Sequence, residues 1–155
     1  PEPTMKYSKI MKERIRRVRV LFKELGYDIF EGEKQEDSYS AGIDDSNDFQ
    51  CGFFIDNDSK FLEIAFTFAF SVKMGQFLQK NLEEMLKICY EFGCYMNIFK
   101  SEEEISFSVF SKLYFAGLNY YALRDTMNDF KACVEDLKSI LDIQSGDEGD
   151  RDEPA

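Results

Sequence analysis

The sequence predicts an α+β domain in which helices pack on one face of an antiparallel sheet. Three observations support this prediction. Large apolar residues fill every second position of residues 62–70, which is the period of a half-buried strand. Apolar residues recur every three to four positions in three other segments, which is the period of amphipathic helices. The remaining segments are short alternating runs bounded by Asp, Asn, Ser and Gly, a composition typical of hairpin turns.

The first half of the chain is predicted to form one helix followed by a three-stranded meander. Residues 6–25 suit a helix that stops at Gly26, with an apolar stripe of Met11, Ile15, Val18, Phe22 and Leu25. Residues 27–32 suit either a short strand or an ordered loop. Alternating runs at 39–43 and 49–55 then flank the turn cluster 45–48. A second turn at 56–59 leads into the long strand, whose predicted buried face consists of Leu62, Ile64, Phe66, Phe68 and Phe70.

The second half is predicted to add a helix, a hairpin and a final helix. The second helix ends at Gly93 and has the stripe Leu78, Leu82, Met85, Cys89 and Phe92. Residues 94–99 and 105–110 alternate about the charged turn 100–104, which indicates a hairpin. The last helix begins at Asn119 as its N-cap, with the stripe Leu123, Met127, Phe130, Val134, Leu137 and Leu141. The predicted order is therefore α-β-β-β-α-β-β-α.

The length of 155 residues favours one domain, which we place at residues 6–143. Residues 1–5 are predicted to be a flexible N-terminus. Residues 144–155 are rich in Asp, Glu and Gly without large apolar side chains, so they are predicted to be a disordered acidic tail. No run of about 18 apolar residues suggests a membrane span, and the expected location is cytoplasmic.

Composition argues against the common catalytic chemistries. The chain has no histidine, which excludes Ser-His and Cys-His catalysis. The four cysteines lack paired CxxC spacing: Cys51, Cys89, Cys94 and Cys133. We therefore expect them to be small buried apolar residues and not to form a zinc site. The acidic groups at 44–48 and 56–58 are interpreted as turn residues because their spacing does not match a calcium-binding loop. The sequence thus predicts a protein that is not an enzyme, with no cofactor and no metal.

Charge is distributed unevenly along the chain. Residues 6–24 carry eight basic side chains against two glutamates, a net charge of +6, whereas the whole chain carries −11 and the remainder therefore −17. The basic residues gather on one helix face, formed by Lys9, Lys12, Arg16, Arg19 and Lys23. This basic helix face suits a solvated surface or contact with the acidic body. The alternative is a sensor that binds a small molecule or an anionic membrane surface, whereas the acidic remainder argues against nucleic acid.

The element order resembles that of the superfamily containing type III secretion chaperones and the YbjN-like proteins. The resemblance covers the chain to about residue 142, and it is carried by residues 82–88 (LEEMLKI) leading to 95–99 (YMNIF), then by 105–109 (ISFSV) and by 128–131 (NDFK) continuing to Leu137. It implies a homodimer that acts by binding a partner polypeptide rather than by catalysis. The basic first helix departs from the acidic pattern of the secretion chaperones.

The surplus of aromatic residues, with 16 Phe and 8 Tyr, indicates that some of them lie at an interface. The predicted partner or dimer surface consists of Phe107, Val109, Tyr114, Tyr120 and Tyr121. For the tyrosines, closure of the core at the end of the sheet is the alternative. Arg14 falls inside the apolar arc of the first helix, so it is expected either to extend from the apolar edge toward solvent or to pair with a carboxylate across a dimer interface.

Overall fold

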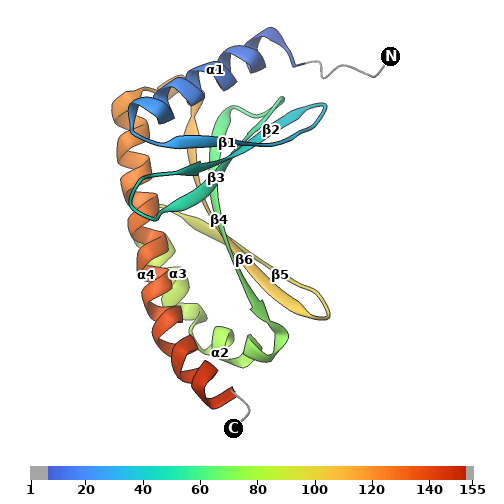
Figure 1. Ribbon diagram of the computed structural model, residues 1–155, viewed down its shortest axis with the longest axis vertical. Coiled ribbons are helices and arrows are strands. Elements are labelled where there is room, and N and C mark those ends of the chain that lie inside the picture. Colours follow the sequence, from blue (N-terminus) through green and yellow to red (C-terminus); the bar gives the residue numbers. More distant parts are fainter. Residues whose placement is uncertain (1–6, 153–155) are drawn as a thin grey trace.

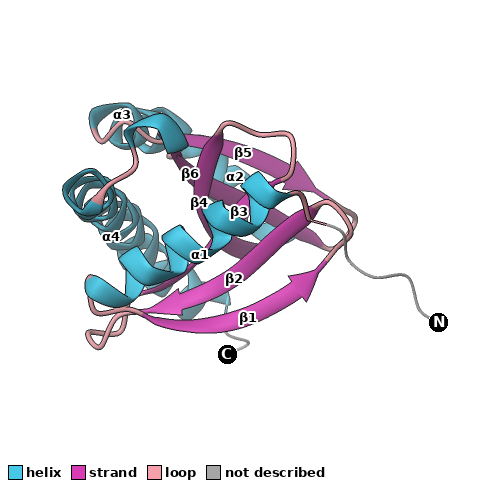
Figure 2. Cartoon of the chain, turned by 90° about the horizontal axis from the view of Figure 1, so that it is seen from above, coloured by secondary structure: helices cyan, strands magenta, loops and turns pink. Residues whose placement is uncertain are grey.

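The computed structural model describes residues 7–152, and it describes the side chains of residues 7–32 and 35–141. It confirms the predicted α+β class, because six strands form one antiparallel sheet with the helices on one side (Figures 1 and 2). In chain order the elements are α1 (Lys9–Glu24), β1 (Asp28–Lys34), β2 (Ser38–Asp44), β3 (Gln50–Asp56), β4 (Phe61–Ser71), η1 (Val72–Met74), α2 (Gly75–Lys80), α3 (Leu82–Glu91), β5 (Tyr95–Lys100), β6 (Glu104–Tyr114), η2 (Phe115–Gly117) and α4 (Tyr120–Asp152).

The strands follow the order β1-β2-β3-β4-β6-β5, and every neighbouring pair is antiparallel. β6 therefore lies between β4 and β5, although β5 precedes it in the chain. The two longest strands pair along their whole length, from Phe61 opposite Tyr114 to Ser71 opposite Glu104. This order leaves β1 and β5 as the two edges of the sheet.

Helix α1 forms where its apolar stripe predicts it. The Ser8 side chain caps its first turn by accepting a hydrogen bond from the Met11 N–H at 3.0 Å. Gly26 follows the helix with a φ of +96°, a conformation that glycine adopts without steric penalty. Phe22 is buried and stacks on Phe53 of β3, with 5.1 Å between ring centroids. This stacking places α1 on the same face of the sheet as Leu62 and Ile64, which we call the covered face.

The predicted buried face of β4 is covered unevenly. Leu62 and Ile64 are fully buried, whereas Phe66, Phe68 and Phe70 are only partly buried. These phenylalanines lie in the second half of β4, and their rings pack against one another. Phe68 stacks on Phe107 of β6 with 4.6 Å between ring centroids. The expectation of a wholly buried face is therefore correct for the first half of the strand only.

The single helix predicted before Gly93 is divided into α2 and α3 in the structure. The break lies at Asn81, whose backbone leaves helical geometry with φ −101° and ψ 5°. Its side-chain amide donates a hydrogen bond to the Phe77 carbonyl at 2.8 Å, the local side-chain bonding by which asparagine competes with a helix. The predicted stop is confirmed, since Gly93 adopts a φ of +70°.

Helix α4 starts at the predicted N-cap, because the Asn119 Oδ1 accepts a hydrogen bond from the Ala122 N–H at 2.8 Å. The six residues of its predicted stripe are all buried. The helix then continues through residues 144–152, where the sequence predicts a disordered tail. Once the apolar stripe anchors a helix, each further residue adds a hydrogen bond without a new nucleation step. The predicted flexible residues 1–5 lie outside the described residues.

Candidate interaction surface

One face of the sheet packs against none of the described helices (Figure 2). This face carries exposed aromatic side chains. We call it the outer face. Its side chains alternate with the buried ones along each strand, because successive residues of a strand point to opposite sides. Five of its large apolar residues are between 37% and 68% exposed: Phe30, Phe54, Tyr95, Phe99 and Tyr114. Soluble proteins rarely expose so many large apolar groups on one face, so this surface is the first candidate for binding.

Small residues form the centre of the outer face. Strand register aligns Phe30, Gly42, Gly52, Ala65 and Phe110 in one row across β1, β2, β3, β4 and β6. The three middle positions have no side chain larger than a methyl group. The row is thus low in the middle and bounded by an aromatic ring at either end.

Aromatic and charged groups cluster on the outer face between β4, β5 and β6. The Tyr95 hydroxyl donates a hydrogen bond to the Glu63 carboxylate at 2.8 Å, and its ring stacks on Phe110 with 5.3 Å between centroids. The Lys112 ammonium lies 4.4 Å from the centre of the Phe61 ring. Burial raises the pKa of Tyr95, and the neighbouring Glu63 carboxylate raises it further. Tyr95 therefore stays neutral near pH 7 and remains a hydrogen-bond donor.

The two sheet edges differ in their protection. The β1 edge is irregular, because its pairing register with β2 shifts between Glu31 and Lys34. β5 pairs regularly with β6 from Tyr95 to Lys100 and carries one charged side chain, Lys100, at its end. A regular strand with exposed apolar side chains and an open edge is a site where another strand can pair.

A cleft of about 640 Å³ lies on the covered face beside β5. It is bounded by α2 and α3 on one side and by β5 and β6 on the other. Ile98 lines it and remains 47% exposed although it belongs to the covered face. The helix layer therefore does not fully cover β5, and this strand presents apolar side chains on both faces of the sheet.

The predicted surface residues separate into two groups. Phe107 and Val109 are buried, since they lie on the covered face of β6, and the prediction of a partner surface does not hold for them. Tyr114 is exposed on the outer face, where its ring packs edge-on against Phe61 at 5.8 Å. Tyr120 and Tyr121 lie at the start of α4, with their rings 5.3 Å apart. Tyr121 is exposed and Tyr120 is half-buried.

Sequence reasoning missed the outer-face residues Phe30, Phe54, Tyr95 and Phe99. A signal for β5 was present, because Tyr95, Ile98 and Phe99 place large apolar groups at both odd and even positions of one short strand. Such a pattern indicates a strand whose two faces are both covered, either by other parts of the chain or by a partner.

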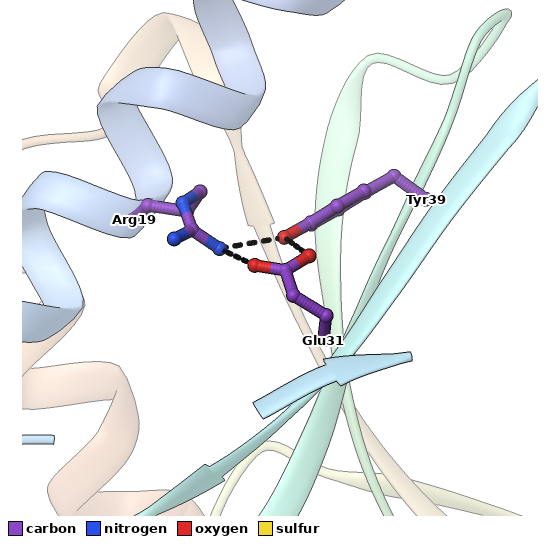
Figure 3. A network of polar contacts seen from close by, with 3 residues as sticks. All are labelled: Arg19, Glu31 and Tyr39. Carbon is purple, nitrogen blue, oxygen red and sulfur yellow. Dashed lines mark hydrogen bonds and ion pairs between the residues drawn. The ribbon is translucent and has the colours of Figure 1, made fainter. Parts of the chain in front are cut away.

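Two arginines of the basic helix face contact acidic groups of the same chain. Arg16 forms an ion pair with Glu13 one turn earlier in α1. Arg19 forms an ion pair with Glu31 of β1 and donates a hydrogen bond to the Tyr39 hydroxyl at 2.9 Å (Figure 3). The Tyr39 hydroxyl in turn donates to Glu31 at 2.8 Å. The Arg19 contact matches the alternative in which the basic face meets the acidic body, whereas Arg16 pairs within α1 and Lys9, Lys12 and Lys23 are exposed.

Arg14 makes contacts within the chain. Its guanidinium lies 4.4 Å from the centre of the Phe115 ring, and its Nη1 donates a hydrogen bond to the Ser59 carbonyl at 2.9 Å. Arg14 thus connects α1 to the turn before β4 and to η2. The alternative of a carboxylate partner across a dimer interface stays a prediction.

We expect Arg14→Ala to lower the free energy of unfolding by about 1–3 kcal/mol, because it removes a charged hydrogen bond and a cation–ring contact. Arg14→Lys keeps the charge but lacks the planar group that makes both contacts, so its loss should be intermediate. Urea denaturation followed by circular dichroism measures both values. An unchanged midpoint for Arg14→Ala would contradict this role.

Three of the four cysteines meet in the core. Cys89 of α3, Cys94 before β5 and Cys133 of α4 are buried, as the sequence predicts, whereas Cys51 is partly buried. Hydrogen bonds with Cys89 and Cys94 raise the pKa of the Cys133 thiol, which therefore stays protonated at neutral pH. Among the described residues, no group of three cysteine, aspartate or glutamate side chains is arranged to hold a metal ion.

Comparison with known proteins gives a likeness of fold. No protein-family model matches the chain, and no curated protein matches it. A solved structure of an uncharacterized protein from Methanothermobacter thermautotrophicus is similar, with a TM-score of 0.56 and 15% sequence identity. The match covers 82% of this chain and 96% of that one. The chain therefore has a fold that is also found in that protein. Within the described part of the chain, no helix has the length and apolar character needed to cross a membrane.

Proposed function

We propose that this protein is a non-enzymatic binding module that holds a partner polypeptide against the outer face of its sheet. The observation that supports this proposal most directly is the set of five exposed aromatic residues on a face without a covering helix. Phenylalanine and tyrosine supply large, rigid contact areas at small cost in conformational entropy, which is why they are enriched in interface cores.

The shape of the outer face suits a polypeptide with an apolar stripe. The low row through Gly42, Gly52 and Ala65 lets a partner backbone or small side chains approach the sheet closely. The rings of Phe30 and Phe110 bound that row, while Glu63 and Lys112 offer charged groups for orientation. Apolar contact would supply most of the affinity, and the charged groups would set direction and rate.

The resemblance in element order supports the same class of function. The resemblance to type III secretion chaperones and YbjN-like proteins implies a domain that acts by binding another polypeptide. We therefore propose a chaperone-like role for this chain. A sensor that uses the basic helix face is less favoured, because two of its five basic residues already pair with carboxylates in the same chain.

The test is a comparison of two variants in partner binding. The partner is isolated from the native host by pull-down, purified, and titrated by isothermal calorimetry. Phe54→Ser combined with Tyr114→Ser should weaken binding at least about thirtyfold, the effect of losing one interface hot spot of about 2 kcal/mol. Val20→Ser combined with Leu86→Ser removes comparably exposed apolar groups from α1 and α3, and it should leave the affinity unchanged.

Equal binding by the outer-face variant and the wild type would rule out the outer face as the partner site. An equal loss of affinity in the control variant would mean that the partner binds exposed apolar side chains without preference for the outer face. Thermal unfolding of all three proteins checks that the substitutions leave the fold intact.

A further inference from the structure

Exposed apolar residues are concentrated around β5. Among the side chains that the structure describes, eleven large apolar ones are exposed, and five of them fall within residues 86–99: Leu86, Tyr90, Tyr95, Ile98 and Phe99. All five belong to β5 or to α3, the helix that packs against it. They surround a regular, unpaired sheet edge at one end of the strand order.

We propose that β5 pairs antiparallel with β5 of a second copy of this chain, with Asn97 opposite Asn97, so that two sheets join into one. This interface shares Tyr95 and Phe99 with the outer face, but it uses the open edge of β5 and does not rest on the proposed partner site. The residues of β5 indicate which strand pairs, that its partner is a second copy of the chain, and which residues lie opposite one another.

Two-fold symmetry restricts the possible registers. In an antiparallel pair, opposite residues point to the same face of the sheet. A two-fold axis between two copies of β5 must be perpendicular to the sheet, so outer-face residues meet outer-face residues. The symmetry centre therefore falls on a residue, and Asn97 and Ile98 are the central choices within Tyr95–Lys100.

The side chains favour the centre at Asn97. In that register Tyr95 faces Phe99 of the other copy twice on the outer face, and Met96 faces Ile98 twice on the covered face. Aromatic and apolar cross-strand pairs are the stabilising kind. A centre at Ile98 would instead place Met96 opposite Lys100 and Asn97 opposite Phe99. Tyr95 is already held by Glu63 and Phe110, which lowers the entropy lost on pairing.

Charge also favours a second copy at this edge. Two chains of net charge −11 repel each other over most of their surfaces. β5 has no acidic residue, and its one charged residue is Lys100. In the register centred on Asn97, Lys100 faces Cys94 of the other copy, just after the C-terminal end of α3. That end has the negative pole of the helix dipole and the exposed Glu91, both of which attract a lysine, while the exposed Glu102 and Glu103 of the turn after β5 reduce this attraction.

A cysteine placed at the symmetry centre tests the register. Opposite residues of an antiparallel pair have Cα atoms about 4.5–5.5 Å apart, within the range that a disulfide spans. After mild oxidation with diamide, Asn97→Cys should migrate mostly as a covalent dimer on a non-reducing gel. Thr67→Cys is the matched control, because Thr67 is exposed in the same cross-strand row two strands away, and it should show only the wild-type background.

Sedimentation velocity at tens of micromolar protein tests the interface itself. The wild type should sediment as a dimer, and Ile98→Glu combined with Phe99→Glu should sediment as a folded monomer. Phe30→Glu introduces the same charge at a 55% exposed phenylalanine on the opposite edge strand, and it should remain a dimer.

Three results would overturn the proposal. A monomeric wild type would exclude the dimer, and a dimer dissociated by Phe30→Glu but not by the β5 variant would exclude this edge. Cross-linking of Ile98→Cys in preference to Asn97→Cys would exclude the register. The outer-face partner is tested independently, because that test substitutes Phe54 and Tyr114, which lie outside β5, whereas Tyr95 and Phe99 belong to both surfaces.

Discussion

Replacing Phe22 with alanine is expected to lower the free energy of unfolding by about 3–5 kcal/mol. The side chain is 0% exposed, stacks on Phe53 at 5.1 Å and meets the edge of the Tyr27 ring at 5.5 Å. Its removal leaves a cavity between α1 and the sheet that rigid strands cannot close. Domains have total stabilities of about 5–15 kcal/mol, so the loss is a large fraction of the whole.

Urea denaturation at one fixed protein concentration measures this loss, because dimerisation would make apparent stability depend on concentration. Phe30→Ala is the matched control. It removes the same atoms from a 55% exposed position on the outer face, and we expect a change below about 1 kcal/mol. Equal losses for the two variants would show that α1 is not anchored through Phe22.

Replacing Asp45 with alanine is expected to lower the free energy of unfolding by about 2–3 kcal/mol. Its Oδ1 accepts hydrogen bonds from the N–H groups of Asn47 at 2.8 Å and Phe49 at 3.0 Å. Its Oδ2 accepts one from Lys131 of α4 at 2.9 Å. A single carboxylate thus shapes the turn between β2 and β3 and connects that turn to α4.

The Asp45 contribution should depend on pH. Burial alone would raise the pKa of this carboxyl, but the hydrogen bonds from Lys131 and the two backbone N–H groups outweigh burial and lower it. The folded-state pKa is therefore below the unfolded value of about 3.9. The stabilisation is fully present above that value and is lost as pH falls through the folded-state pKa.

Asp45→Asn is the matched variant for the pH series. Its amide oxygen can still accept from the turn N–H groups, but it has no charge for Lys131 and no carboxyl to titrate. The difference in unfolding free energy between wild type and Asp45→Asn should be constant at neutral pH and shrink below about pH 4. A difference that stays constant down to pH 2 would show that Asp45 has an ordinary pKa in the folded protein.

Local periodicity accounts for the parts of the fold that could be predicted. The spacing of Met11, Val18 and Phe22 determines which face of α1 is buried, and the alternation through Leu62 and Ile64 does the same for β4. Helix ends at Gly26, Gly93 and Asn119 follow from backbone conformation and capping, which are properties of a few adjacent residues.

The same reasoning could have corrected the predicted surface. Ser106 and Ser108 alternate with Phe107 and Val109 along β6, so the alternation itself places the two apolar residues on the buried side. The break at Asn81 is harder to foresee, because the apolar stripe continues across it. The break is seen in the non-helical backbone of Asn81 and in its side-chain hydrogen bond to Phe77, both of which the structure provides.

By itself, the sequence determined the α+β class, most of the elements and the buried face of most of them, because each depends on residues within a few positions of one another. It left residues 27–32 open between a strand and a loop, where the structure has β1, and it joined α2 and α3 into one helix. Tertiary structure decided that β6 lies between β4 and β5, that β5 is an edge, and that the helices leave the outer face uncovered. These features depend on pairing between segments far apart in the chain, such as Phe61 with Tyr114. Phe107 lies in a strictly alternating strand, whereas Phe99 lies in a strand with apolar residues on both faces, and only the edge position of β5 relative to the helices decides that Phe99 is exposed.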